Sequence, residues 1–261
     1  MWGAIIGDIA GSVYLFVPFE TEEVELLQNN CFYTDDSVCT AAVAEILLDN
    51  LPAAPTLQRW GRNHPNRGYG TMFRNWIASP DPQPYHSYGN GAVMRVSPAA
   101  FLNRSHPLEE ALAATDRVTR ITHNHPEGMK GARAATHAIW LAFQKYEPKD
   151  IRKTIEREYE YDLSKAVDDI RSGYSYSNTC QQTVPEAITC ALESTSFEDA
   201  VRNAISLGGD SDTLAAIAGP IAEAMHGIPD HLVAQAVDQS LSGAPDIVKV
   251  MERMYKTAVR T

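Results

Sequence analysis

The chain has 261 residues, of which 44% are hydrophobic and 21% are charged, and this ordinary globular composition excludes a disordered or fibrous protein. Its formal net charge of -11 excludes a nonspecific nucleic-acid-binding protein, because so acidic a surface would repel a phosphate backbone. No apolar run is long enough to cross a bilayer, and we therefore expect a monomer with one domain over residues 1–261 and no membrane association.

The opening segment, MWGAIIGDIAGSVYLF, predicts a helix with a glycine face. Gly3, Gly7 and Gly11 share one side of that helix, where missing side chains would let a neighbouring helix approach closely. The same spacing occurs in membrane dimers, but the polar Asp8 and the short length argue against that interpretation. Asp8 and the lack of a basic leading region or clear cleavage site also argue against a signal peptide.

The cysteines argue against two common kinds of cysteine site. They include no C-x-x-C pair, so neither a zinc ribbon nor a thioredoxin-like redox centre is expected. We interpret them as reduced thiols of a cytoplasmic protein: Cys31, Cys39, Cys180 and Cys190.

Residues 37–50, SVCTAAVAEILLDN, have apolar positions at helical period and end shortly before Pro52. This pattern places Asp35 and Asp36 at the start of a helix. Residues 63–97 follow with many Gly, Pro, Asn and Tyr residues, and they contain two turn-like pieces, NHPNRGYG and ASPDPQPYHSYGNG. We expect these loops to line a binding site, as long loops often do.

Further helical patterns cover most of the remaining chain. We predict helices within residues 108–123, 128–146, 185–195, 197–209 and 214–227, and we interpret the charged stretch 150–174 as a solvated helical face. No window shows sustained alternation of apolar and polar residues. The sequence therefore predicts an all-α domain.

Two acidic clusters flank predicted helix starts. Asp35-Asp36 follows Thr34, and Asp210-x-Asp212 precedes Thr213. Neighbouring carboxylates repel one another, a bound cation removes that repulsion, and these oxygen donors suit Mg²⁺ or Mn²⁺. Two clusters therefore suggest two metal ions. Either cluster alone is equally well explained by helix N-capping.

The glycines before the second cluster favour the metal interpretation. Gly208 and Gly209 allow a tight turn that would direct Asp210 and Asp212 inward.

Six motifs, in this order, span almost the whole chain: GAIIGDIAGSVY, CFYTDDSV, SYGNGAVMRVSP, THNHPEGMKGA, QQTVPEAI and AISLGGDSDTLAAIAGPIAEA. The ordered set resembles the ADP-ribosylglycohydrolase family. This resemblance implies a compact orthogonal bundle of helices and a hydrolase that releases ADP-ribose from a protein side chain, a nucleobase or a small molecule. It also implies two Mg²⁺ or Mn²⁺ ions, bound by residues matching Thr34, Asp35, Asp36, Asp210, Asp212 and Thr213.

The resemblance also assigns catalytic and substrate-binding residues. The four aspartates Asp35, Asp36, Asp210 and Asp212 would be metal ligands first, and one of them would orient or deprotonate the attacking water. His123 would help to form the ribose or phosphate pocket. The diphosphate and its neighbouring ribose would meet a loop rich in backbone donors, formed by Ser87, Tyr88, Gly89, Asn90 and Gly91.

Simpler interpretations stand beside these assignments. The loop 87–91 is also compatible with an ordinary turn, and His123 with His125 is compatible with part of a zinc site, although no Cys or His cluster supports one. The remaining candidates are better explained by structure than by catalysis. Gln181, Pro185 and Glu186 suit a helix start with proline in its first turn, and Tyr85, Tyr174 and Tyr176 suit packing rather than adenine stacking.

One position departs from the family pattern. Bacterial members typically have a glutamate after GSVY, where this chain has Leu15, and leucine can neither bind a cation nor transfer a proton. Catalysis could use water and the metal ligands alone, or Glu20 or Glu22 could supply the carboxylate. We predict retained hydrolysis; the alternatives are a protein that binds ADP-ribose or a nucleotide with weak or no turnover, and a structural protein descended from the enzyme.

Overall fold

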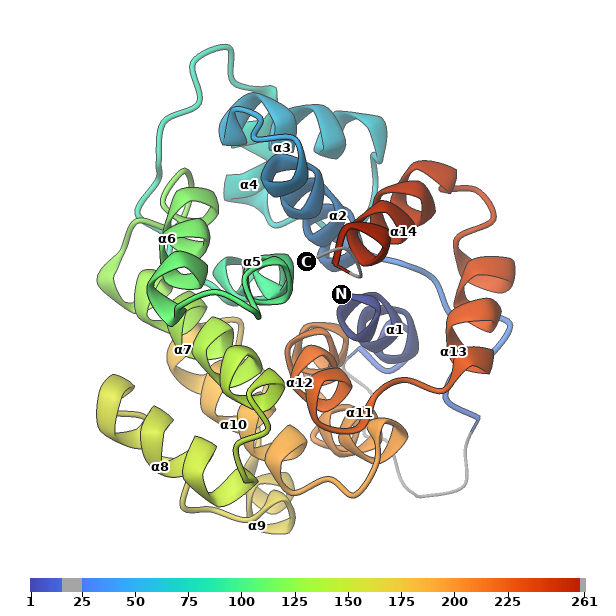
Figure 1. Cartoon of the computed structure of the whole chain (residues 1–261). Helices are drawn as coiled ribbons and strands as arrows, with labels where there is room; N and C mark the ends of the chain where they lie inside the picture. The colour runs from blue at the N-terminus through green and yellow to red at the C-terminus, as the bar shows by residue number, and fades with distance from the viewer. Residues whose placement is uncertain (16–24, 259–261) are drawn as a thin grey trace.

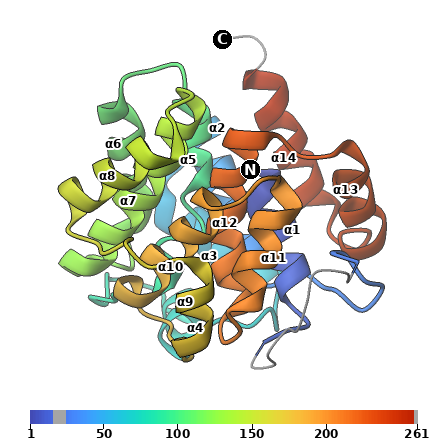
Figure 2. The same cartoon turned by 90° about the horizontal axis from the view of Figure 1, so that it is seen from below.

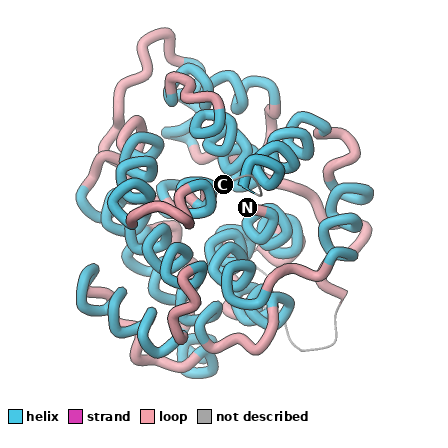
Figure 3. Tube along the Cα trace, in the orientation of Figure 1, coloured by secondary structure: helices cyan, strands magenta, loops and turns pink. Residues whose placement is uncertain are grey.

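The computed structural model describes residues 1–15 and 25–258, and this part of the chain contains fourteen α-helices and no β-strand (Figures 1 and 3). An isolated bridge between Gly89 and Thr179 is its one β-like pairing. The predicted all-α fold is therefore confirmed. None of the helices in these residues is long and apolar enough to cross a membrane.

The helices follow one another with short connections. They are α1 (Trp2–Gly11), α2 (Asp35–Leu48), α3 (Ala53–Asn63), α4 (Thr71–Ala78), α5 (Ser97–Leu102), α6 (Leu108–Thr119), α7 (Pro126–Phe143), α8 (Pro148–Tyr159), α9 (Val167–Gly173), α10 (Cys180–Leu192), α11 (Phe197–Ser206), α12 (Ser211–His226), α13 (Asp230–Gln235) and α14 (Pro245–Ala258). A 3₁₀ turn covers Asn90–Ala92, and a π-helical turn covers Ala236–Ser240.

Helices α1 and α12 pack directly against each other in the interior (Figures 1 and 2). The glycine face of α1 makes this possible. A Cβ atom added at Gly7 would lie 2.2 Å from the carbonyl oxygen of Ala215, and one added at Gly3 would lie 2.5 Å from that of Gly219. At Gly11, the added atom would lie 2.5 Å from the Cα atom of Asp212. The predicted close approach is confirmed, and it brings α1 to the first turn of α12.

Other helices enclose this pair. Helix α12 also packs against α7, α10 and α11, while α2 packs against α1, α3, α5 and α14. In Figure 1, α2 therefore lies on one side of α1 and α12 on the other. The first turns of α2 and α12, which carry the two predicted acidic clusters, meet next to α1.

The structure differs from the sequence predictions in local detail. The charged stretch 150–174 is divided into α8 and α9, because Glu160 adopts a left-handed conformation (φ 55°) that ends α8. Helix α10 begins at Cys180, so Pro185 lies inside the helix rather than in its first turn. Between the two predicted loops lies a short helix, α4, and α14 was not predicted.

Candidate metal centre and cavity

The first acidic cluster lies in the first turn of α2. Thr34 is the N-cap residue, and its hydroxyl accepts a hydrogen bond from the backbone N–H of Asp36 (3.3 Å). Asp35 and Asp36 are therefore free of the capping role, which Thr34 performs. The N–H of Asp35 donates to the carbonyl oxygen of Arg67 (2.7 Å), so the loop after α3 is held against this helix start.

The second cluster lies at the start of α12. Gly208 and Gly209 have φ angles of 76° and 68°, which are favourable for glycine, so the predicted tight turn is present. Asp210 occupies the N-cap position, but its side chain makes no capping bond and instead accepts a hydrogen bond from Asn90 Nδ2 (2.7 Å). Its carboxylate is thus turned toward the glycine-rich loop.

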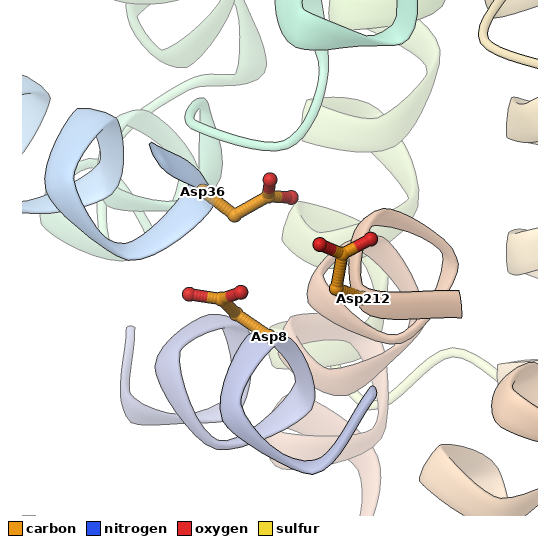
Figure 4. Close-up of side chains that lie close together, drawn as sticks. All are labelled: Asp8, Asp36 and Asp212. Atoms are coloured by element: carbon orange, nitrogen blue, oxygen red, sulfur yellow. The ribbon is translucent and has the colours of Figure 1, made fainter. Parts of the chain in front are cut away.

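The two clusters meet at Asp36 and Asp212, together with Asp8 of α1 (Figure 4). Each of these three buried residues offers a carboxylate oxygen, and the three oxygens lie within 4.8 Å of one another. No other group of three or more His, Cys, Asp or Glu side chains in residues 1–15 and 25–258 has this spacing. The structure therefore gives no support to a zinc site at His123 and His125.

Asp8 was missed by the sequence analysis as a site residue. Its carboxylate accepts hydrogen bonds from the backbone N–H (2.9 Å) and hydroxyl (2.6 Å) of Thr34. It also accepts hydrogen bonds from the N–H (3.1 Å) and hydroxyl of Ser37. Its signal in the sequence was a single carboxylate within an otherwise apolar helix, on the glycine face between Gly7 and Gly11, where a buried charge needs a partner.

The cluster is electrostatically crowded. Burial raises the pKa values of Asp36 and Asp212 well above the usual range, and repulsion from neighbouring aspartates raises them further. Burial, followed by the charge of Asp8, raises the pKa of Asp35 to about 7. Burial also raises the pKa of Asp210, although its hydrogen bond from Asn90 opposes that shift.

One carboxylate oxygen of this cluster lacks a partner. Asp36 Oδ1 is buried and accepts no hydrogen bond from the described residues, while Asp36 Oδ2 lies 3.4 Å from the hydroxyls of both Thr34 and Thr213. A buried carboxylate oxygen without a donor is costly unless a cation binds it. The donor set, made of oxygen atoms alone, fits a hard divalent cation such as Mg²⁺ or Mn²⁺.

All six predicted metal ligands line one cavity of about 510 Å³. Five of the six predicted substrate-binding residues line it too. They are Ser87, Gly89, Asn90, Gly91 and His123. Tyr88 does not line the cavity; it is exposed, and its ring centroid lies 5.1 Å from that of His125.

The cavity also contains residues whose roles the sequence left open. Tyr85 and Tyr176 line it, whereas a Cβ atom added at Gly209 would lie 3.0 Å from Cε1 of Tyr174, so Tyr174 packs under the turn before Asp210. Leu15, at the position of the family glutamate, lines the same cavity. The alternative carboxylates Glu20 and Glu22 lie outside the described residues.

The fold and this cavity define an all-α protein with a candidate centre for divalent cations beside a glycine-rich loop. The family model of ADP-ribosylglycohydrolases matches residues 1–259. The chain therefore belongs to the ADP-ribosylglycohydrolase family, as its ordered motifs predicted.

Individual relatives support this membership. The chain is 26% identical over 265 residues to the ADP-ribosylarginine hydrolase Tri1 of Pseudomonas putida (strain GB-1), covering 87% of this chain and 69% of that protein. It is 25% identical over 334 residues to the ADP-ribosylhydrolase ARH3 of Mus musculus, covering 97% and 89%. A solved structure named ADP-ribosylglycohydrolase-related protein complex matches with a TM-score of 0.70 and 23% identity, over 97% of this chain and 95% of that one. This structural likeness shows the fold alone.

Proposed function

We propose that this protein is a metal-dependent hydrolase that cleaves the glycosidic bond between ADP-ribose and an acceptor. The observation that carries the proposal is the buried oxygen cluster around Asp36, with its unpartnered Oδ1, in the same cavity as the glycine-rich loop. Family membership supplies the class of substrate. The acceptor would be a protein side chain, a nucleobase or a small molecule.

Six residues would hold two Mg²⁺ or Mn²⁺ ions: Thr34, Asp35, Asp36, Asp210, Asp212 and Thr213. When bound, the ions would hold ribose hydroxyls and polarise a water molecule. The cavity adds two features that suit a reaction through an oxocarbenium-like state. The pKa of about 7 suits Asp35 to exchange a proton with water, and Asn90 fixes the direction of the Asp210 carboxylate.

The glycine-rich loop would bind the diphosphate and its neighbouring ribose through Ser87, Tyr88, Gly89, Asn90 and Gly91. The loop is held in place at both ends of the 3₁₀ turn. The N–H of Asn90 donates to the carbonyl oxygen of Asn178 (2.8 Å), and Cys180 N–H donates to that of Tyr88 (2.9 Å). Because those bonds fix the loop backbone, little ordering would be needed when a ligand binds. His123 would complete the ribose or phosphate pocket.

The test is the release of free ADP-ribose from arginine-, serine- and nucleic-acid-linked substrates, with Mg²⁺ or Mn²⁺ and with EDTA. We expect metal-dependent release from at least one substrate class. Asp212→Asn should abolish the release, whereas Asp238→Asn, a substitution of an exposed aspartate outside the cavity, should not. Equal release by wild type and Asp212→Asn would contradict the assignment.

A second candidate is a protein that binds ADP-ribose without cleaving it, and Leu15 in the wall of the cavity favours it. Calorimetry that shows metal-dependent ADP-ribose binding, with no release from any substrate, would support this candidate. Leu15→Glu should then introduce turnover, because it returns a carboxylate to the cavity. Absence of bound metal in a metal-content measurement would support the structural-protein alternative instead.

A further inference from the structure

Arg95 is a buried cation that the proposed reaction does not use. It is 1% exposed, lies in the wall of the cavity, and forms no ion pair with any carboxylate in the described part of the chain. Its Nε atom is buried without a hydrogen-bond partner. A buried guanidinium without an ion-pair partner is costly, so its position calls for a function.

The guanidinium of Arg95 ends in a short hydrogen-bond chain that leads to His123. Arg95 Nη2 donates to the hydroxyl of Thr122 (2.5 Å), and this hydroxyl lies 2.8 Å from His123 Nδ1. Arg95 Nη2 also faces Nδ1 directly at 3.5 Å. An alternative acceptor for the Thr122 hydroxyl, the carbonyl oxygen of Thr119, is more distant at 3.4 Å.

This chain sets the direction of each hydrogen bond. A guanidinium is always protonated and can only donate, so a proton on His123 Nδ1 would point at another donor. The favourable arrangement has Thr122 donating to an unprotonated Nδ1. The imidazole is then neutral and carries its proton on Nε2.

The other side of the ring faces the glycine-rich loop. A Cβ atom added at Gly91 would lie 3.4 Å from His123 Nε2, and one added at Gly89 would lie 3.8 Å from it. No described residue accepts a hydrogen bond from Nε2, and His123 lines the cavity. A proton on Nε2 is therefore available to an oxygen atom of a ligand beside Gly91.

We propose that Arg95 is a positioning residue, which acts through Thr122 to hold His123 as a neutral Nε2–H donor directed at the ligand oxygen beside Gly91. The identity of that oxygen, in the ribose or the diphosphate of ADP-ribose, rests on the proposed function. Burial and the Arg95 charge also lower the pKa of His123 well below its ordinary value, which agrees with a neutral ring. A neutral donor does not add a second mobile charge to a cavity that already contains a crowded acidic cluster.

The direct test is nitrogen-15 NMR of the histidine rings, with His123 assigned by its loss in His123→Gln. We expect wild type at neutral pH to show a protonated Nε2 and an unprotonated Nδ1. Thr122→Val removes the relaying hydroxyl and should produce a mixture of the two tautomers. Thr122→Ser keeps the hydroxyl and should restore the wild-type pattern.

Thr119→Val is the matched control. Thr119 is also fully buried at the same end of α6, but its hydroxyl has no hydrogen-bond partner among the described residues, so this substitution should leave the His123 spectrum unchanged. Arg95→Met should shift the tautomers in the same direction as Thr122→Val. A wild-type ring protonated on Nδ1, or a Thr122→Val spectrum identical to wild type, would overturn the proposal.

Calorimetry then connects the tautomer to binding. Thr122→Val should weaken ADP-ribose binding in the presence of Mg²⁺ about fivefold, the loss expected for one neutral hydrogen bond, and Thr119→Val should not. Unchanged affinity of Thr122→Val would overturn the role of the donor in ligand binding. If wild type itself does not bind ADP-ribose, the proposed function fails, whereas the NMR result still decides whether Arg95 positions His123.

Discussion

The carboxylate of Asp8, in α1, accepts hydrogen bonds from both the backbone N–H and the hydroxyl of Thr34, the N-cap residue of α2. Through this pair, the first helix of the chain fixes the turn that carries Asp35 and Asp36. Asp8 also adds a third carboxylate to Asp36 and Asp212, so it combines a supporting role for the candidate metal centre with a share of its negative charge.

We therefore expect Asp8→Asn to weaken Mn²⁺ binding about tenfold to a hundredfold, the usual cost of losing a group that supports metal ligands. The fold should be retained, because the asparagine oxygen can accept the bonds from Ser37 while its amide faces the Thr34 hydroxyl. Mn²⁺ titration calorimetry measures the change. Asp49→Asn, on the surface near Arg253, is the control, and equal affinities for the two variants would contradict this role.

Bound metal should stabilise the protein against heat. A ligand present at a hundred times its dissociation constant contributes about 2.7 kcal/mol, which corresponds to several degrees in Tm for a chain of this size. We expect Mn²⁺ to raise the Tm of wild type and to have little effect on Asp36→Asn, which lacks the unpartnered Oδ1 at the centre of the cluster. Differential scanning calorimetry with Mn²⁺ and with EDTA measures both, and an equal Mn²⁺ shift in the two proteins would contradict the site.

The contact between α1 and α12 leads to a prediction about stability. Gly7→Ala should destabilise the fold by about 3 kcal/mol or more, because the added methyl group would meet backbone atoms of Ala215 rather than a flexible side chain. Urea unfolding measures the loss. Gly243→Ala, where an added Cβ atom meets nothing within 4 Å, should be close to wild type. Similar unfolding midpoints for both variants would show that the helices do not pack this closely.

Glu186 should make stability depend on pH. Burial raises its pKa from 4.5 to about 7, so the folded protein holds a proton there that the unfolded chain releases. The unfolding free energy should consequently fall as pH rises from about 4.5 to 7 and then become level. Glu186→Gln removes this contribution, so the variant should gain stability relative to wild type at pH 8 but not at pH 4.5.

The gain at pH 8 should be roughly 1 kcal/mol, because partial exposure of Glu186 screens its charge. Urea unfolding of both proteins across this pH range measures it. Glu252→Gln, at an exposed glutamate, should leave the pH profile unchanged. A constant difference between wild type and Glu186→Gln at all pH values would show that Glu186 does not titrate in this way.

Several features of the site were predictable because their causes are local. Thr34 and the two aspartates after it carry the pattern of a helix start, and Gly208-Gly209 carries that of a tight turn. The division of 150–174 into two helices was not predicted, since the left-handed conformation of Glu160 has no strong residue preference behind it. The monomeric state, the single domain and the cytoplasmic location stay predictions.

The sequence by itself determined the all-α class, the glycine face of α1 and the two acidic helix starts, because helical period and turn chemistry act over a few neighbouring residues. Only the tertiary structure decided which carboxylates meet. The close packing of α1 on α12 adds Asp8 to Asp36 and Asp212, and the packing around Arg95 connects it to Thr122 and His123. These contacts join residues far apart in the chain, so they depend on how whole helices pack and leave no local pattern.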